Sequence, residues 1–335
     1  MGLRRMYGII NALKTNQFPM YGEKLLARHG RNTLPVQDFP LGGGYFTADP
    51  RNVQAVLATN FKDWSMGSSR DFLHDFLGKG IFTQDGTEWH QSRALLRPSF
   101  TRTQIADFEV LEEHSEEMFQ TINELKVNNI IDLKDLVSDL TLDFSAQFLF
   151  GKSADALKQR REGSGEKGLA FWFGRSLWYV TASFGFGGMH WLYRPREYLD
   201  GRKFVHNYID KVVADALEAH DERLRSGEKQ EKSGRYVFLT ALTDEIQDPT
   251  ALRAQVINIM LAGRDTTASL ISWSIWVLAR NPRVFRQLRS EIALHLGVGS
   301  KSRLPTWQEL KDMKYLQAVI HESMSPFHVA DWPSG

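Results

Sequence analysis

The chain has 335 residues, 42% hydrophobic and 12% aromatic, which is enough apolar surface for a large packed core. Its 41 basic residues nearly balance 40 acidic ones, so no overall field would attract nucleic acid or an anionic membrane. There is no cysteine, which excludes disulfides, thiolate zinc sites, iron–sulfur clusters and cysteine nucleophiles among these residues.

The amino-terminal region predicts short elements of mixed type. Residues up to about Gly30 have the spacing of a helix, with Tyr21, Leu25 and Leu26 on one side. Between residues 39 and 48, a glycine triplet followed by aromatic residues predicts a turn that leads into a short strand. No Lys-Ser or Lys-Thr follows the triplet, so it is not a phosphate-binding loop.

After Pro50 the chain is predicted to be overwhelmingly helical. The helices are expected over residues 52–57, 88–96, 104–125, 133–150 and 196–220. Two polar stretches, 155–168 and 221–235, predict solvated loops or disordered inserts. An aromatic stretch, 171–193, predicts a helix and a flexible turn, and such aromatic residues are more often part of a core than of a cofactor site.

The longest predicted helix begins at Asp248-Pro249, an N-cap and a first-turn proline, and ends at Asn281-Pro282. Residues 256–278 are almost wholly apolar and long enough to span a bilayer. However, Arg264 and Asp265 lie at the middle, where each charge costs about 2.5–3.5 kcal/mol in a membrane. A helix buried on most sides within a large core is the better interpretation.

Two groups of residues could carry chemistry, and the first is Ala262-Gly263-Arg264-Asp265-Thr266-Thr267 in that helix. A glycine, two charges and two hydroxyls are each costly inside a buried helix, so a partner or a function must account for them. One interpretation is structural: a buried Arg–Asp pair, with the threonine hydroxyls bonded to carbonyls one turn earlier.

The second group is the pair Trp89 and Arg93, four residues apart on a predicted helix. Residues at this spacing share a face, so the indole N–H and the guanidinium point the same way and could bind one carboxylate. The simpler interpretation is a surface cation–π contact between the two side chains.

Together the two groups resemble the cytochrome P450 family of haem-thiolate monooxygenases, in particular its fungal alkane- and fatty-acid-hydroxylating branch. The hexapeptide is similar to the family's Ala/Gly-Gly-x-Asp/Glu-Thr-Thr/Ser signature, and the pair is similar to its Trp-x-x-x-Arg motif. A predicted capping box, Thr306 with Glu309, and residues 316–322 extend the resemblance, which runs from about residue 5 to Met324. It implies a mainly α fold with a small β part, the cytochrome P450 fold.

The resemblance also implies roles for individual residues. Trp89 and Arg93 would hold a haem propionate. Ala262 and Gly263 would border the haem, Gly263 by letting the backbone approach a flat cofactor.

Thr266 would compete for the Ala262 carbonyl and open the helix into a groove for dioxygen and water. It would donate to the iron-bound peroxo oxygen, and Asp265 would link it to solvent as a proton relay, while Thr267 supports the geometry.

By lineage the protein would hydroxylate an apolar substrate, such as a fatty acid, an alkane or a secondary metabolite, with dioxygen and electrons from NADPH. An NADPH–cytochrome P450 reductase would dock near Arg97 and Arg102 of a full-length relative. Residues 171–193 would form a substrate-access lid that dips toward the membrane, and the family's location is the endoplasmic reticulum membrane. No anchor helix is predicted in this chain, so a cytoplasmic or peripheral location is the alternative.

The pattern departs from the family after Met324. The family motif places an arginine three residues after Glu322, where this sequence has Ser325, and residues 325–335 show no resemblance. We therefore expect an incomplete cytochrome P450 domain over 1–324 followed by an aberrant tail over 325–335. The axial cysteine is absent and no metal ligand is predicted, so haem binding is in question and the chain is expected to be inactive as it stands. The alternatives are a non-catalytic remnant and a helical protein that binds an apolar ligand.

Overall fold

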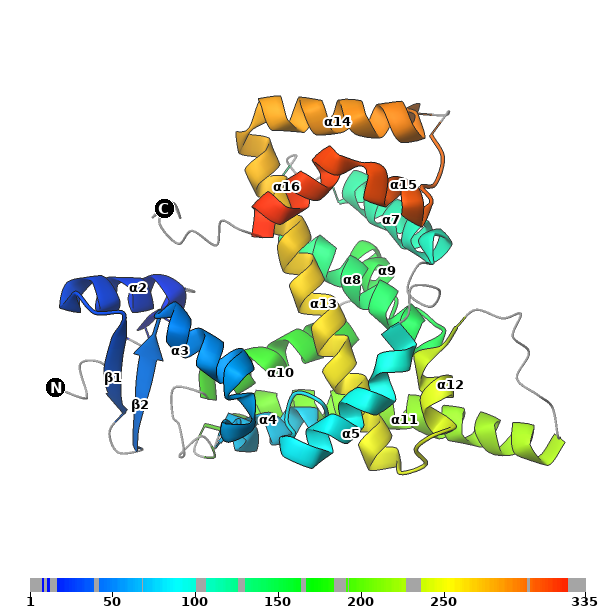
Figure 1. The fold of residues 1–335 in the computed structure, drawn as a ribbon. Helices are drawn as coiled ribbons and strands as arrows, with labels where there is room; N and C mark the ends of the chain where they lie inside the picture. The colour runs from blue at the N-terminus through cyan, green and yellow to red at the C-terminus, as the bar shows by residue number, and fades with distance from the viewer. Residues whose placement is uncertain are drawn as a thin grey trace. The chain divides into compact units, whose positions relative to one another are not determined.

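The computed structural model describes residues 8, 11–12, 17–38, 42–67, 69–100, 107–125, 130–163, 167–183, 191, 193–226, 236–299 and 302–324. These residues are mainly helical, with a single two-stranded sheet among them, so the predicted fold class is confirmed (Figure 1). They divide into two compact units. The first is built from 1–93 and 172–206, and the second from 94–171 and 207–328.

The first unit begins with a helix and a hairpin. Its elements are α2 (Phe18–His29), β1 (Thr33–Asp38), β2 (Gly42–Thr47), α3 (Pro50–Gln54), a π-helical turn (Ala55–Thr59), a 3-10 turn (Phe61–Asp63), α4 (Ser69–Leu77) and the start of α5 (Gly86–Leu96). The strands are antiparallel, with Val36 paired with Gly44. Gly22 lets α2 approach this hairpin, because a Cβ there would lie 2.3 Å from the Phe46 ring.

The predicted turn at the glycine triplet is wrong. The triplet lies inside β2, where Gly42 and Gly43 pair with Asp38 and Gln37. The preceding strand β1 supplies hydrogen-bond partners that local glycine content could not reveal. Residues 39–41 lie outside the described part of the chain.

Two further helices complete the first unit with their parts between 172 and 206: α10 (Leu169–Ser183) and α11 (Arg196–Ser226). The Phe76 ring of α4 is fully buried and lies 5.7 Å from that of Phe173 in α10. Beside it, Asp75 accepts a hydrogen bond of 2.8 Å from the Tyr198 hydroxyl and pairs with Arg202. An aromatic core with charged pairs at its edge therefore holds these helices together.

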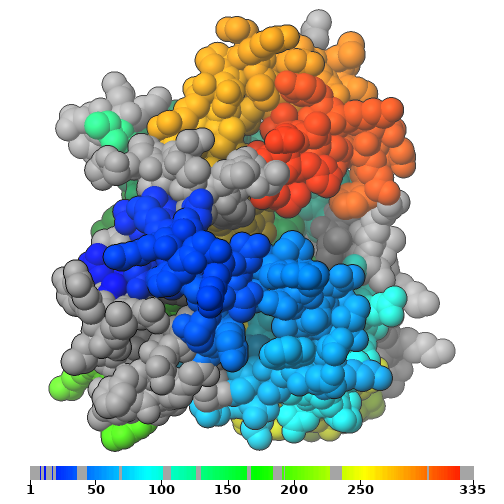
Figure 2. Space-filling model, turned by 60° about the vertical axis from the view of Figure 1, so that its left-hand side comes forward, coloured from blue at the N-terminus to red at the C-terminus, as the bar shows by residue number. Residues whose placement is uncertain are grey.

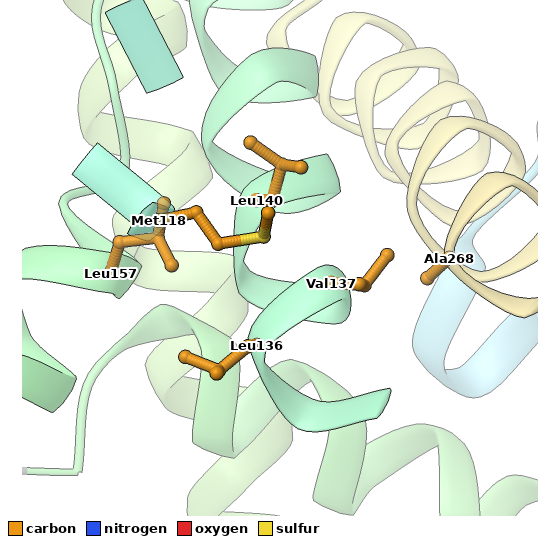
Figure 3. Packing of buried hydrophobic residues seen from close by; sticks show 6 residues of the cluster. All are labelled: Met118, Leu136, Val137, Leu140, Leu157 and Ala268. Carbon is orange, nitrogen blue, oxygen red and sulfur yellow. The ribbon is translucent and has the colours of Figure 1, made fainter. Parts of the chain in front are cut away.

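The regular elements of the second unit are all helices among its described residues. Its elements are a 3-10 turn (Arg97–Phe100), α7 (Phe108–Glu124), α8 (Leu133–Phe150), α9 (Ala156–Glu162), α12 (Phe238–Thr243), α13 (Pro249–Arg280), α14 (Pro282–Leu296), α15 (Trp307–Asp312) and α16 (Lys314–Met324). Its core joins four of these helices: Met118 comes from α7, Leu136, Val137 and Leu140 from α8, Leu157 from α9 and Ala268 from α13. Figure 3 shows Val137 pointing toward Ala268, and Met118 lying between Leu140 and Leu157.

Helices α14, α15 and α16 lie side by side in the second unit (Figures 1 and 2). The Glu291 carboxylate of α14 accepts hydrogen bonds from the backbone N–H groups of Tyr315 and Leu316, at 3.0 and 2.8 Å. These two groups belong to the first turn of α16 and have no partner within their own helix. Glu291 therefore caps α16 from a neighbouring helix.

Several predicted helices are confirmed, and α8 and the two ends of α13 match the predicted limits. Two expectations about loops are wrong. The first polar stretch contains α9, whose Leu157 is fully buried, and α11 continues to Ser226 into the second stretch. Charged residues gave both segments the composition of linkers, but α9 is packed through its inner face, whereas the end of α11 extends as a mostly exposed helix with Leu224 67% exposed. Residues 164–166, 184–190 and 227–235 lie outside the described part.

The expectation that α13 is buried on most sides holds only for its first half. Its buried positions run from Leu252 to Ala268, and Ile275 is 42% exposed. Apolar composition makes burial favourable, but the neighbouring helices decide which turns are covered. Within the described residues, no helix is both long and apolar enough to cross a membrane.

If α9 is part of the core, Leu157→Ala should destabilise the protein by about 2–5 kcal/mol, because it leaves a cavity where a buried side chain was. The free energy of unfolding, measured in urea, tests this. Lys158→Ala is the matched control on the exposed side of the same helix and should change stability by less than about 0.5 kcal/mol. Equal effects of the two substitutions would show that α9 is not docked.

Candidate functional site

The hexapeptide 262–267 lies in the middle of α13, which is capped at its start by the Asp248 side chain, an acceptor for the Thr250 N–H at 3.0 Å. The helix remains α-helical from Pro249 to Arg280. The predicted local opening at this point is therefore absent. The hydrogen bond that was expected to cause it is present: the Thr266 hydroxyl donates to the Ala262 carbonyl at 2.6 Å. A threonine hydroxyl can share that carbonyl with the helix without breaking it.

One face of the hexapeptide packs closely against α8. A Cβ at Gly263 would lie 2.6 Å from the Ser145 Oγ, closer than packed atoms come. One residue further on, the Arg264 carbonyl accepts a hydrogen bond of 3.0 Å from the Thr141 hydroxyl of α8. The close approach of α8 thus explains why a glycine stands at position 263, and the sequence did not suggest this explanation. Its predicted role beside a flat cofactor stays a prediction.

The predicted Arg–Asp pair is present, but only its arginine is buried. The Arg264 guanidinium lies 3.0 Å from an Asp265 carboxylate oxygen. Arg264 is 9% exposed, whereas the Asp265 side chain is 45% exposed, so the pair joins the buried face of α13 to solvent. Burial raises the pKa of the Asp139 carboxyl of α8. The positive charges of Arg160 and Arg264 favour its ionised form and so reduce that rise.

The opposite face of the hexapeptide is open. Thr266 and Thr267 are both exposed, and Asp265 lies beside them at the edge. Since residues 262 and 266 are one turn apart, the face presents the Ala262 carbonyl with its bound hydroxyl. The arrangement therefore places a hydroxyl and a half-exposed carboxylate next to each other on an accessible surface.

Trp89 and Arg93 share one face of α5, as predicted. The Arg93 guanidinium carbon lies 5.4 Å from the centre of the Trp89 ring, and the Phe61 ring packs on Trp89 at 5.4 Å. The simpler interpretation, a cation–π contact, is therefore confirmed. Arg93 is exposed and has no carboxylate partner among the described residues, so its donors can bind an anion from solvent.

Glu322 is exposed near the end of α16. A motif carboxylate without its arginine would be costly if it were buried and charged. Solvent reaches the Glu322 side chain in the structure, so this cost does not arise. The predicted capping box at the start of α15 is confirmed, with the Thr306 hydroxyl and the Glu309 carboxylate each accepting the other's backbone N–H.

The structure brings the residues from Ala262 to Thr267 together on one helix of the second unit, while Trp89 and Arg93 form a pair in the first unit. The sequence reasoning missed Thr141 and Ser145, the α8 residues that hold the hexapeptide. The available signal was a pair of small hydroxyl residues four apart in an otherwise apolar helix, which is typical of close helix contact.

Comparisons with known proteins agree with the resemblance to the cytochrome P450 family that the two motifs indicated. The sequence profile of the family Cytochrome P450 matches residues 45–329. Cytochrome P450 52A1 of Candida tropicalis is 38% identical over 288 residues, which cover 83% of this chain and 52% of the relative. Cytochrome P450 52A3-B of Candida maltosa is 33% identical over 333 residues, which cover 97% of this chain and 63% of the relative. Cytochrome P450 52-M1 of Starmerella bombicola is 34% identical over 303 residues, which cover 86% of this chain and 56% of the relative.

The match to the family profile covers most of the chain, and two of these relatives are more than a third identical to it, so the chain belongs to the cytochrome P450 family. These relatives are family members numbered 52 from Candida and Starmerella, in agreement with the fungal branch that the two motifs resemble. The chain spans about half the length of the curated relatives it matches.

The Gly263 contact can be tested with a pair of substitutions. Gly263→Ala should destabilise the protein by about 1–3 kcal/mol, because the new Cβ meets the Ser145 hydroxyl. In a Ser145→Ala background the nearest α8 atom, the Cβ of residue 145, would lie 3.6 Å away, an ordinary contact. There Gly263→Ala should be neutral, or stabilising by up to about 1 kcal/mol, since alanine favours the helix. Additive effects in thermal or urea unfolding would contradict this contact.

Proposed function

We propose that the complete protein is a haem-dependent monooxygenase that hydroxylates an apolar substrate, such as an alkane or a fatty acid, with dioxygen and electrons from NADPH. Membership of the family supports the reaction class. The observation that carries the proposal to individual residues is the 2.6 Å hydrogen bond between the Thr266 hydroxyl and the Ala262 carbonyl, on an exposed face of α13.

The residues available fit one part of a haem and leave another part without a candidate. Arg93 offers a guanidinium without a carboxylate partner among the described residues, and the Trp89 indole N–H lies on the same helix face. These donors suit the propionate groups of a haem. The thiolate ligand has no candidate among the 335 residues, because none is a cysteine. If bound through a thiolate, haem would supply the metal centre at which dioxygen is activated, with the electrons coming from NADPH.

In this proposal the chain's own contribution at α13 is proton handling. A hydroxyl has a single proton, and in the structure the Thr266 hydroxyl uses it to donate a hydrogen bond to the Ala262 carbonyl. To donate toward a bound reactant, Thr266 must rotate away from that carbonyl or receive a proton. Asp265 is half-exposed and can exchange protons with water, while its bond to Arg264 holds its carboxylate in place.

The substrate and partner assignments rest on further side chains. Trp178 and Trp191 are large and exposed, at 46% and 60%, and we propose that they belong to an apolar entrance that meets the substrate or a membrane surface such as that of the endoplasmic reticulum. Arg97 is exposed and would face an electron-donating reductase. Arg102, proposed with it, lies outside the described residues.

The test uses a fusion in which residues 1–324 are followed by the corresponding carboxyl-terminal region of cytochrome P450 52A1. The reduced fusion should give the carbon monoxide spectrum of a thiolate-bound haem. In the fusion, Thr266→Ala should leave substrate binding and haem content unchanged and lower the product formed per NADPH consumed, because proton delivery alone is impaired. Arg93→Ala should instead weaken haem retention by about 1.5–3 kcal/mol, since a charge-assisted bond is lost.

The matched control is the 335-residue chain itself, which should not give that spectrum because it has no cysteine. Thr267→Ala, one residue along the same exposed face, should lower coupling less than Thr266→Ala. Equal losses of haem in Thr266→Ala and Arg93→Ala would show that the two roles are wrongly assigned. Stoichiometric binding of a fatty acid by a fusion that takes up no haem would favour the apolar-ligand-binding alternative.

A further inference from the structure

A second polar cluster lies where α7, α8 and α9 meet, away from the hexapeptide. It consists of His114 and Glu117 on α7 and Asp143 on α8, with one ligand atom of each within 4.8 Å of those of the other two. His114 is 7% exposed and Asp143 is fully buried, whereas Glu117 is half-buried. None of these side chains takes part in the proposed reaction.

His114 is the informative member. Its Nε2 atom is buried and has no hydrogen-bond partner among the described residues. Buried polar atoms without partners are rare in folded proteins, and each one needs an explanation such as an ion or a water. The two carboxylates of the cluster lie within reach of the same histidine ring.

Asp143 is held in place from the other side. Its two oxygens accept the backbone N–H groups of Ala156 and Leu157, at 2.9 and 3.0 Å, in the first turn of α9. A carboxylate has about four acceptor positions, so further ligation remains available. Glu117 has one basic neighbour, Arg161, at 3.7 Å.

The surroundings favour a cation. The cluster borders the core of Figure 3, with Met118 one turn along α7 from His114 and Leu157 beside Asp143. A cation shared by the three residues would give the buried His114 Nε2 the partner that it lacks in the described part of the chain, and it would offset the negative charge of the two carboxylates.

We propose that His114, Glu117 and Asp143 bind a divalent transition-metal ion, zinc in the first place, which ties α7 to α8. One imidazole nitrogen and two carboxylate oxygens form a ligand set that zinc accepts, and three protein ligands leave one tetrahedral position for water. Zinc ligands lie about 3.3–3.6 Å from one another, so small side-chain rotations would close the cluster around the ion. The sequence predicted no metal ligands, because these three residues come together only in the fold.

The experiment uses the 335-residue chain, stripped with a chelator and then titrated with Zn²⁺ by calorimetry. We expect one equivalent per chain and a higher melting temperature with zinc than without it. His114→Ala and Glu117→Gln should each weaken zinc binding by at least about 10–100-fold. His321→Ala is the matched control: it removes an exposed histidine of the same unit and should leave the affinity unchanged.

Absence of a stoichiometric zinc site in the stripped chain would overturn the proposal. So would unchanged affinity in Glu117→Gln, a conservative change at a half-buried position that should fold even if His114→Ala does not. A preference for Mg²⁺ over Zn²⁺ would also contradict it, because Mg²⁺ prefers oxygen ligands in octahedral geometry. The readout is independent of haem, so failure of the proposed oxygenase function would leave this result interpretable.

Discussion

The contact between α8 and α13 is the constraint on which the second unit depends. At Gly263 there is no room for even a methyl group beside Ser145, and the Thr141 hydroxyl binds the Arg264 carbonyl of the facing helix. These two contacts fix both the separation and the rotation of α13. As a consequence Arg264 and Ala268 face the core, while Thr266 lies on the exposed side.

The same unit buries several charged groups and compensates each of them. Asp139 pairs with Arg160 and is also stabilised by Arg264, and Asp143 caps the first turn of α9. Burying a charge is costly, so such groups persist only where partners are provided. The buried Nε2 of His114 has no partner in the described part of the chain, and it lies within reach of two carboxylates; these two observations together are the reason to infer a bound ion.

Residues of the hexapeptide 262–267 make structural contacts as well as carrying the groups proposed for chemistry. Arg264 occupies the variable position of the family signature, yet its backbone joins α8 and its side chain holds Asp265. Gly263 has a packing role, because the absence of a side chain lets Ser145 of α8 come close. A motif glycine or charge is therefore not by itself a sign of contact with a cofactor, and the substitutions that separate packing from chemistry are the informative ones.

The sequence by itself determined the helices whose signals are local. The Asp248 cap, the proline at position 249 and the apolar spacing of 133–150 act within a few residues, and the predicted limits of α8 and α13 match the structure. The motifs at Trp89 and Arg93 and at 262–267 were sufficient to indicate the family. Only the tertiary structure decided that the glycine triplet pairs with β1, that α9 is docked through Leu157, that α13 is buried in its first half and that Glu322 is exposed. It also decided which side chains meet at His114. Each of these depends on a partner that lies elsewhere in the chain, and burial and hydrogen bonding are properties of the pair of segments, not of either segment alone.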